Sequence, residues 1–106
     1  MKKEDFCPIR DILDKTADKW SLLVLYPLRE NEVKRFSELQ KAIPDISQKM
    51  LTQTLRRLEE MSLISREAYP EVPPRVEYRL TELGRSFMAN IEPLVSWAIE
   101  NRDRCL

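Results

Sequence analysis

The sequence predicts one mainly α-helical domain with a small β-hairpin, and three observations support this fold class. Apolar residues recur with the helical period of about 3.6 over most of the chain, whereas residues 63–69 and 75–80 alternate with a period of about 2. The length of 106 residues is close to the commonest size of one domain. No repeat, low-complexity tract or linker divides the chain, so residues 1–106 are predicted to form a single domain.

The first two predicted helices begin at residues that suit helix starts. Pro8 fits the first position of a helix, with Cys7 as the preceding cap. Asp18 is expected to cap a second helix over residues 19–29, which is apolar nearly all round and should therefore be the central buried helix. Pro27 should kink or shorten this helix, because proline cannot donate a backbone hydrogen bond.

Two further helices follow, joined by about four residues, which is the spacing of a helix-turn-helix motif. A very short strand is expected at residues 35–36. Ser37, with Gln40 three residues later, matches a capping box that opens the shorter helix. Ser47 is expected to cap the longer helix, which ends near residue 60.

The chain after this motif predicts a wing and a last helix. Residues 63–69 and 75–80 read as two strands, and the proline-rich segment 70–74 between them cannot join a sheet ladder. A β-hairpin directly after a helix-turn-helix is a wing. Thr81 should cap a last helix whose broad apolar surface exceeds what one small core can cover, and Pro93 predicts a bend in it.

The longer helix of the motif, over residues 47–60, separates into an apolar and a polar face at about 100° per residue. The apolar side chains are Met50, Leu51, Leu55, Leu58 and Met61. The polar ones are Gln48, Lys49, Thr52, Gln53 and Arg56, with Arg57 at the border. Amides and guanidinium groups pair with base edges, while cations and hydroxyls hold phosphates. The simpler interpretation is a solvated face, and the sharper one is a helix that enters the major groove of DNA.

Charge is distributed unevenly although the chain as a whole is neutral, with 18 basic and 18 acidic residues. Residues 34–57 hold six cations and two anions, which leaves the rest of the chain acidic. Such local asymmetry can steer a polyanion to one face of a protein.

Other function classes lack the residues that they require. The chain has no His, one Gly, and two cysteines at opposite ends of the sequence. This excludes a Cys/His metal cluster within one chain, a Ser-His or Cys-His catalytic pair, and a phosphate-cradling glycine loop, so neither an enzyme nor a cofactor is expected. No apolar run reaches the roughly 20 residues of a membrane span and no signal peptide is recognised, which predicts a soluble, cytoplasmic protein.

Several longer motifs match a known family in their order and spacing. They are CPI at 7–9, DKW at 18–20, RFSEL at 35–39, ISQKMLTQTLRRLE at 46–59 and PEVPPRVEYRLTELGRS at 70–86. On these motifs the chain resembles the HxlR-type winged helix-turn-helix transcriptional regulators, relatives of the MarR group. The resemblance implies a homodimer on pseudo-palindromic operator DNA, with the first and last helices forming the dimer interface. Pro27 departs from the family pattern.

The candidate contacts to double-stranded DNA lie in and around this motif. They are Arg35, Ser37, Ser47, Gln48, Lys49, Thr52, Gln53, Arg56, Arg57 and Arg75. In the longer helix, glutamine and arginine side chains should read bases, while Lys49, Thr52 and Arg57 hold phosphates. Arg75, beside the proline-rich loop, is either a surface residue at a strand end or a wing cation that reaches a phosphate or the minor groove. Ser37 either holds a phosphate or serves only as a cap.

The cysteines raise the question of redox sensing. A thiolate at a helix N-terminus, as expected for Cys7, is stabilised by the helix dipole, although a buried apolar role is the alternative. The resemblance implies more, because a cysteine at the matching position senses oxidants or electrophiles in some family members. In a homodimer Cys7 of one subunit could form a disulfide with Cys105 of the other, unless Cys105 is merely a frayed terminal residue.

The predicted function is therefore that of a dimeric, sequence-specific DNA-binding transcriptional regulator. The alternative is a winged-helix protein-interaction module that does not bind DNA, because a fold does not dictate a function. An interaction module would expose apolar or aromatic anchors on the longer helix of the motif, and the polar face of that helix has none.

Overall fold

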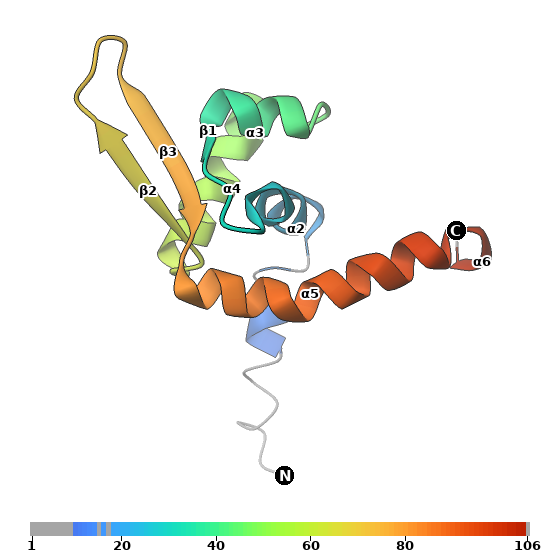
Figure 1. The fold of residues 1–106 in the computed structure, drawn as a ribbon. Helices are drawn as coiled ribbons and strands as arrows, with labels where there is room; N and C mark the ends of the chain where they lie inside the picture. Colours follow the sequence, from blue (N-terminus) through green and yellow to red (C-terminus); the bar gives the residue numbers. More distant parts are fainter. Residues whose placement is uncertain (1–9, 15, 17, 106) are drawn as a thin grey trace.

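The chain folds into a mostly helical domain from which one β-hairpin projects, as the sequence predicts (Figure 1). A computed structural model describes residues 10–14, 16 and 18–105. Residues 10–14 are helical. The elements after them are α2 (Lys19–Leu25), the 3₁₀-helix η1 (Tyr26–Leu28), β1 (Lys34–Arg35), α3 (Phe36–Ala42), α4 (Gln48–Glu60), β2 (Ile64–Tyr69), β3 (Arg75–Leu80), α5 (Glu82–Glu100) and α6 (Arg102–Cys105). The predicted start of the first helix, at Cys7 and Pro8, lies outside the described residues.

Helix α2 begins and ends for local reasons. The Asp18 carboxylate accepts hydrogen bonds from the backbone N–H groups of Trp20 (2.9 Å) and Ser21 (2.8 Å), so the predicted cap is confirmed. The helix was predicted to reach residue 29, but it ends at Leu25 and continues only as the short 3₁₀-helix η1. Pro27 lies inside η1 and has no N–H to donate, which accounts for the predicted shortening.

Helix α3 starts two residues before its predicted first turn, because a strand precedes it directly. Strand β1 pairs with β3 up to Arg35, and Arg35 is the N-cap of α3. The expected capping by Ser37 is therefore wrong, since Ser37 already lies within the helix. Glu38 closes this helix start instead, because its Oε1 accepts a hydrogen bond from the Arg35 N–H at 2.9 Å.

The sheet is antiparallel, with the strand order β1-β3-β2. Strand β3 has the predicted bounds, whereas β2 starts one residue later than expected, and the very short strand before α3 is shifted back by one residue. The hairpin is in register from Ile64 opposite Leu80 to Tyr69 opposite Arg75. Ile64 and Leu80 are buried in the core, so the base of the hairpin is anchored while its loop end projects from the body of the domain (Figure 1).

The core lies where α2, α3, α4 and the base of the hairpin meet. Its buried residues are Val24, Leu25, Leu28, Leu39, Ile43, Ile46, Leu51, Leu55, Leu58, Leu63, Ile64, Tyr78, Leu80 and Met88. Helix α2 is packed against α4 but is not buried all round, because Leu23 is 41% exposed. The prediction of a central buried helix therefore holds for one side of α2 only.

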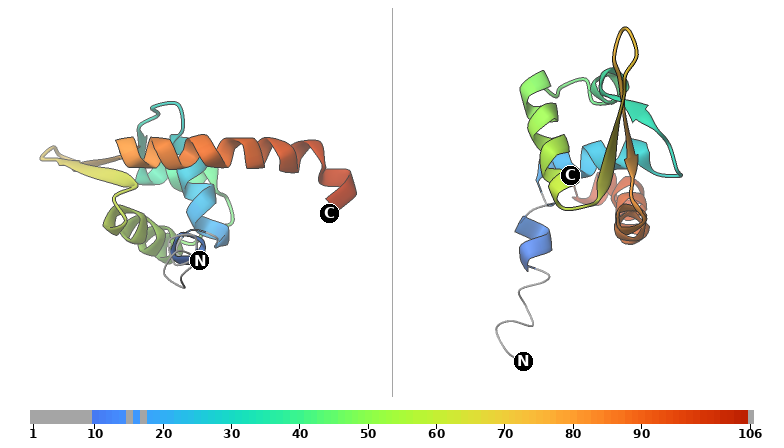
Figure 2. Two further views of the ribbon diagram at one scale, coloured as in Figure 1. Left: turned by 90° about the horizontal axis from the view of Figure 1, so that it is seen from below. Right: turned by 90° about the vertical axis from the view of Figure 1, so that its left-hand side faces the viewer.

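Helix α5 carries much of the apolar surface that the core leaves uncovered. The Thr81 hydroxyl accepts a hydrogen bond from the Gly84 N–H at 2.9 Å, as predicted for the cap, and the helix runs on continuously through Pro93. Its second half extends beyond the rest of the domain (Figures 1 and 2). Leu94 (56%) and Trp97 (53%) are each more than half exposed, which confirms the predicted surplus of apolar surface. None of the described helices is both long and apolar enough to cross a bilayer.

Candidate nucleic-acid interface

Helix α4 presents the polar face that the sequence predicts. Ser47 caps it, with its hydroxyl accepting a hydrogen bond from the Met50 N–H at 3.0 Å. Leu51, Leu55 and Leu58 point into the core, which leaves the opposite face of the helix open to solvent. Five predicted contact residues line one shallow hollow on that face: Gln48, Lys49, Thr52, Gln53 and Arg56. The structure therefore brings together the row of amides, hydroxyl and cations that the helical period predicts.

The five side chains differ in their solvent exposure and in the hydrogen bonds that they can still offer to a ligand. Gln48, Lys49, Gln53 and Arg56 are exposed. Thr52 is half-buried, and its hydroxyl donates a hydrogen bond to the Gln48 carbonyl at 2.8 Å, so it keeps only acceptor capacity for a ligand. Any hydrogen-bond donation from this face must then come from the amides and the two cations.

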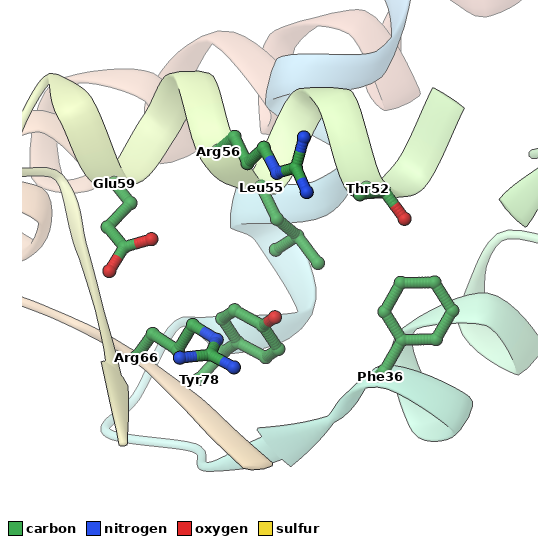
Figure 3. Close-up of a pocket in the computed structure, with 7 residues that line it drawn as sticks. All are labelled: Phe36, Thr52, Leu55, Arg56, Glu59, Arg66 and Tyr78. Carbon is green, nitrogen blue, oxygen red and sulfur yellow. The ribbon is translucent and has the colours of Figure 1, made fainter. Parts of the chain in front are cut away.

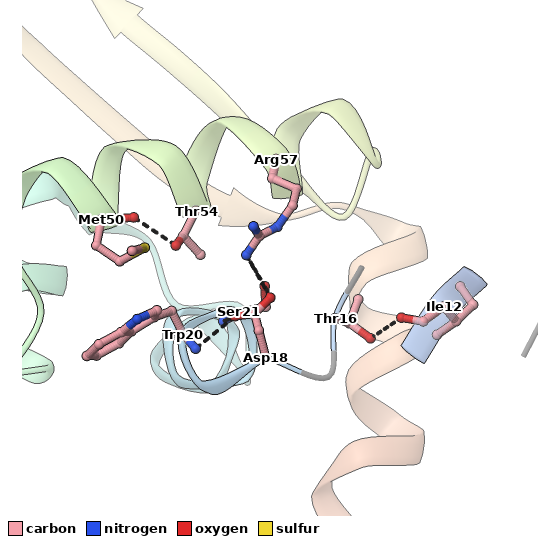
Figure 4. A network of polar contacts seen from close by, with 8 residues as sticks. All are labelled: Ile12, Thr16, Asp18, Trp20, Ser21, Met50, Thr54 and Arg57. Carbon is pink, nitrogen blue, oxygen red and sulfur yellow. Dashed lines mark hydrogen bonds and ion pairs between the residues drawn. The ribbon is translucent and has the colours of Figure 1, made fainter. Parts of the chain in front are cut away.

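Arg57 is turned away from this face and towards α2 (Figure 4). Its Nη2 donates to the Asp18 carboxylate at 2.7 Å and to the Ser21 hydroxyl at 2.9 Å. The Ser21 hydroxyl in turn donates to Asp18 at 2.8 Å. The guanidinium predicted to hold a phosphate thus ties α4 to the N-terminus of α2, and it fixes the orientation of the helix that carries the polar face.

Asp18 is the shared acceptor of this network. Partial burial raises the pKa of its carboxyl group, but hydrogen bonds from the Ser21 backbone and hydroxyl lower it. The charge of Arg57 and the Trp20 N–H lower the pKa further, and the net pKa lies below the usual aspartate value. The ionised carboxylate is therefore the form that the fold stabilises.

Arg75, the predicted wing cation, is half-buried at the loop end of β3. Its guanidinium lies 3.1 Å from the carboxylate of Glu71 and 3.7 Å from that of Glu77. It also lies over the ring of Tyr69, 4.0 Å from the centroid. These contacts hold the two ends of the proline-rich loop together and leave Arg75 with little free charge for a distant ligand.

The remaining predicted contacts flank the helix-turn-helix. Arg35 and Ser37 are exposed at the start of α3, and Ser47 is exposed at the start of α4. The side chains of Arg35 and Ser37 therefore remain available to a backbone phosphate, although Ser37 does not cap the helix.

A cleft of about 380 Å³ lies between α4 and the hairpin (Figure 3). We call it the α4–hairpin cleft, and its lining residues are Phe36, Thr52, Leu55, Arg56, Glu59, Arg66 and Tyr78. Arg66 was not among the predicted contacts. It lies opposite Tyr78 in the hairpin register, two residues after the buried Ile64, so the strand alternation puts it on the side of α4. That alternation is visible in the sequence, but the register that pairs it with Tyr78 is not.

The redox hypothesis falls mostly outside the described residues. Cys7 is not among them, and for Cys105 only the backbone, at the end of α6, is described. Over residues 10–14, 16 and 18–105, no group of three or more His, Cys, Asp or Glu side chains is arranged to hold a metal ion.

Comparison with known proteins identifies the family. The HxlR-like helix-turn-helix family matches residues 16–105. YkvN of Bacillus subtilis, an uncharacterized HTH-type transcriptional regulator, is 54% identical over 95 residues, which cover 90% of this chain and 80% of YkvN. An uncharacterized HTH-type transcriptional regulator of Methanothermobacter thermautotrophicus is 48% identical over 94 residues, 89% of this chain and 71% of that protein.

Solved structures agree with this assignment. The redox regulator HypR in its reduced form matches with a TM-score of 0.84 and 40% identity, and the match covers 91% of this chain and 94% of that chain. The winged-helix architecture inferred from the sequence is thereby confirmed. The chain belongs to the HxlR-like helix-turn-helix family, and it is a transcriptional regulator of the helix-turn-helix type and not an enzyme.

Proposed function

We propose that this regulator binds double-stranded DNA sequence-specifically, as a homodimer on a pseudo-palindromic operator, with α4 in the major groove. The observation that carries the proposal is the polar face of α4, whose amides and cations are exposed in one row while the opposite face is buried. A helix held in this way can lie along a groove without exposing apolar surface to it. The alternative of a protein-interaction module is disfavoured because the polar face has no apolar anchor.

Within this proposal the candidate contacts have different roles. Gln48, Gln53 and Arg56 read base edges, while Lys49 holds a phosphate beside them. The Thr52 hydroxyl, which donates to the Gln48 carbonyl, can only accept a hydrogen bond, for example from a base amino group. Arg35, Ser37 and Ser47 contact the DNA backbone from the ends of the two helices of the motif. Arg57 and Arg75 act chiefly through their ion pairs, by orienting α4 and by shaping the loop of the hairpin.

Replacing Arg56 with Ala is expected to weaken operator binding by about 1–3 kcal/mol, because a bidentate contact to guanine is lost. Fluorescence anisotropy with a duplex selected from random DNA by the wild-type protein measures this change. Arg79→Ala is the matched control, because Arg79 is an exposed arginine on β3 that pairs with Glu77. Wild-type protein that shows no salt-dependent affinity for any duplex would instead favour the protein-interaction module.

The dimer part of the proposal rests on the apolar surface of α5. Leu83, Leu94 and Trp97 lie on one side of this helix at helical spacing and are each more than half exposed. Ile12 and Leu13 of the N-terminal helix are exposed as well, with 44% and 55% of their surface accessible. Apolar surface of this extent marks an interaction site more often than a free surface.

Replacing Leu94 with Glu is therefore expected to shift the protein from dimer to monomer, because the interface would have to bury an unpaired carboxylate. Light scattering coupled to size-exclusion chromatography measures the mass, and loss of operator binding should accompany the shift. Glu100→Gln, on the same helix, is the control. A Leu94→Glu protein that remains dimeric would exclude this face of α5 as the interface.

Regulation through oxidation of Cys7 is the last part of the proposal. It is supported by the cysteine's predicted position before a helix and by the name of the similar protein HypR, a redox regulator. A disulfide to Cys105 of the second subunit would change the dimer geometry and with it the spacing of the two α4 helices.

A further inference from the structure

The α4–hairpin cleft contains two groups that have no role in the contacts proposed for α4: the hydroxyl of Tyr78 and the guanidinium of Arg66. Tyr78 is only 8% exposed, yet within the described part of the chain its hydroxyl has no hydrogen-bond partner. In Figure 3 the phenol oxygen points towards the open space between Arg66 and Phe36. The hydroxyl oxygen itself remains in contact with solvent, so it is free to donate a hydrogen bond to an acceptor that enters the cleft.

The cations of the cleft are also without carboxylate partners. Among the described residues, neither Arg56 nor Arg66 forms an ion pair. On the other face of the same hairpin, by contrast, both Arg75 and Arg79 pair with Glu77. On the outer face of the hairpin, Glu77 therefore neutralises Arg75 and Arg79. On the inner face, which is turned towards α4, the charge of Arg66 remains available to bind an anion.

We propose that the α4–hairpin cleft holds a phosphate of the DNA backbone, with the Tyr78 hydroxyl and the Arg66 guanidinium donating hydrogen bonds to its oxygens. The proposal rests on the proposed function and adds to it a phosphate site beside the contacts made by α4. Arg56, on the facing wall, contributes positive charge to the same site while its guanidinium reads a base.

The position of the cleft favours a DNA phosphate over other anions. Thr52 and Arg56 line both the cleft and the hollow on the polar face of α4, so the two are continuous. A helix that lies in the major groove is flanked by the phosphates of the strands that border the groove. The wall formed by Arg66 and Tyr78 is where such a flanking strand would pass.

Glu59 opposes the proposed occupant and so offers a second test. It lines the cleft, on the wall formed by α4 and at the end away from Thr52 (Figure 3). Its carboxylate lowers the net charge of the cleft and repels a phosphate. Removing this charge should therefore strengthen DNA binding by a few-fold.

The experiment measures duplex affinity as a function of salt concentration for Arg66→Gln, Tyr78→Phe and Glu59→Gln. Arg66→Gln should lose roughly tenfold in affinity and reduce the slope of log K against log salt by about 1, because one charged phosphate contact is lost. Tyr78→Phe should lose about threefold with an unchanged slope, since the phenol is neutral. The losses should be equal on the selected duplex and on an unrelated duplex, because a phosphate carries no sequence information.

Arg79→Gln is the matched control, since it removes an arginine from the opposite face of the same hairpin. It should leave both affinity and slope nearly unchanged, and thermal unfolding of each variant checks that the fold is intact. If Arg66→Gln behaves like Arg79→Gln, or if its loss is confined to the selected duplex, the phosphate site is excluded while DNA binding by α4 stands. If the wild-type protein binds no duplex at all, the proposed function itself is wrong, and the phosphate site that rests on it is excluded as well.

Discussion

Replacing Gly84 with Ala is expected to destabilise the domain by about 3 kcal/mol, although alanine is ordinarily the better helix former by about 1 kcal/mol. The reason is the close approach of α5 to the segment before β2. A Cβ at position 84 would overlap the Leu63 carbonyl oxygen and lie 3.2 Å from Cδ2 of Leu80. The Leu63 carbonyl cannot move away freely, because it accepts a hydrogen bond from the Thr81 N–H at 3.1 Å. Urea denaturation measures the change in the free energy of unfolding.

The control for this substitution lies in the same helix. Ser86 is exposed, so Ser86→Ala should change the free energy of unfolding by no more than about 0.5 kcal/mol. A Gly84→Ala protein as stable as the wild type would mean that α5 can shift away from Leu63 at no cost, and that the hairpin base and α5 are not packed as closely as described.

Replacing Asp18 with Ala is expected to cost about 2 kcal/mol of stability, because two contributions are lost together. The backbone N–H groups at the start of α2 lose their cap, which is worth about 1 kcal/mol. The Arg57 guanidinium loses its carboxylate partner, which contributes a further roughly 1 kcal/mol since both side chains are more than a third exposed, at 39% and 36%. Urea denaturation of both proteins at neutral pH measures the loss.

Asp45→Ala is the matched control. Asp45 pairs with Lys19 at 3.3 Å, but both side chains are more than 60% exposed, and such surface pairs contribute little. Equal losses for the two substitutions would mean that the Asp18 network does not tie α4 to α2.

The Asp18 network also predicts how stability depends on pH. Its pKa is lowered in the folded protein, so its contribution is fully present above the unfolded-state pKa of about 3.9 and is lost as the pH falls through the folded-state pKa. The stability difference between wild type and Asp18→Ala should therefore be constant from about pH 5 upwards and should shrink below about pH 4. A difference that persists unchanged into strong acid would show that the carboxylate charge plays no part.

Much of the fold was predictable because it depends on short-range patterns. The caps at Asp18, Ser47 and Thr81 each accept a hydrogen bond from an N–H group two or three residues further on. Strand β3 has the predicted bounds, because alternation with a period of 2 needs only its own six residues. The cap of α3 was misassigned because its start depends on the pairing of β1 with β3, which are far apart in the sequence.

The candidate site likewise has features that short-range patterns predict and features that depend on distant contacts. The row of polar side chains on α4 follows from the helical period within 13 residues, and no distant contact is needed to predict it. The ion-pair partners of the long cationic side chains could not be predicted from the helical period, because a guanidinium pairs with whichever carboxylate the fold brings near it. Arg75 is held by the loop acid Glu71 as well as by Glu77, two residues further along β3. Arg66, on the inner face of the hairpin, forms no ion pair with any residue that the structure describes.

The sequence by itself determined that α4 has one buried and one polar face, and that a hairpin follows it. Only the tertiary structure decided which cations remain available on that surface. Arg57 sits at the border of the two faces, and its role was set by Asp18, 39 residues earlier in the chain. The physical reason is range: helix and strand periods are properties of neighbouring residues, whereas ion pairs form between groups that only the folded chain brings together.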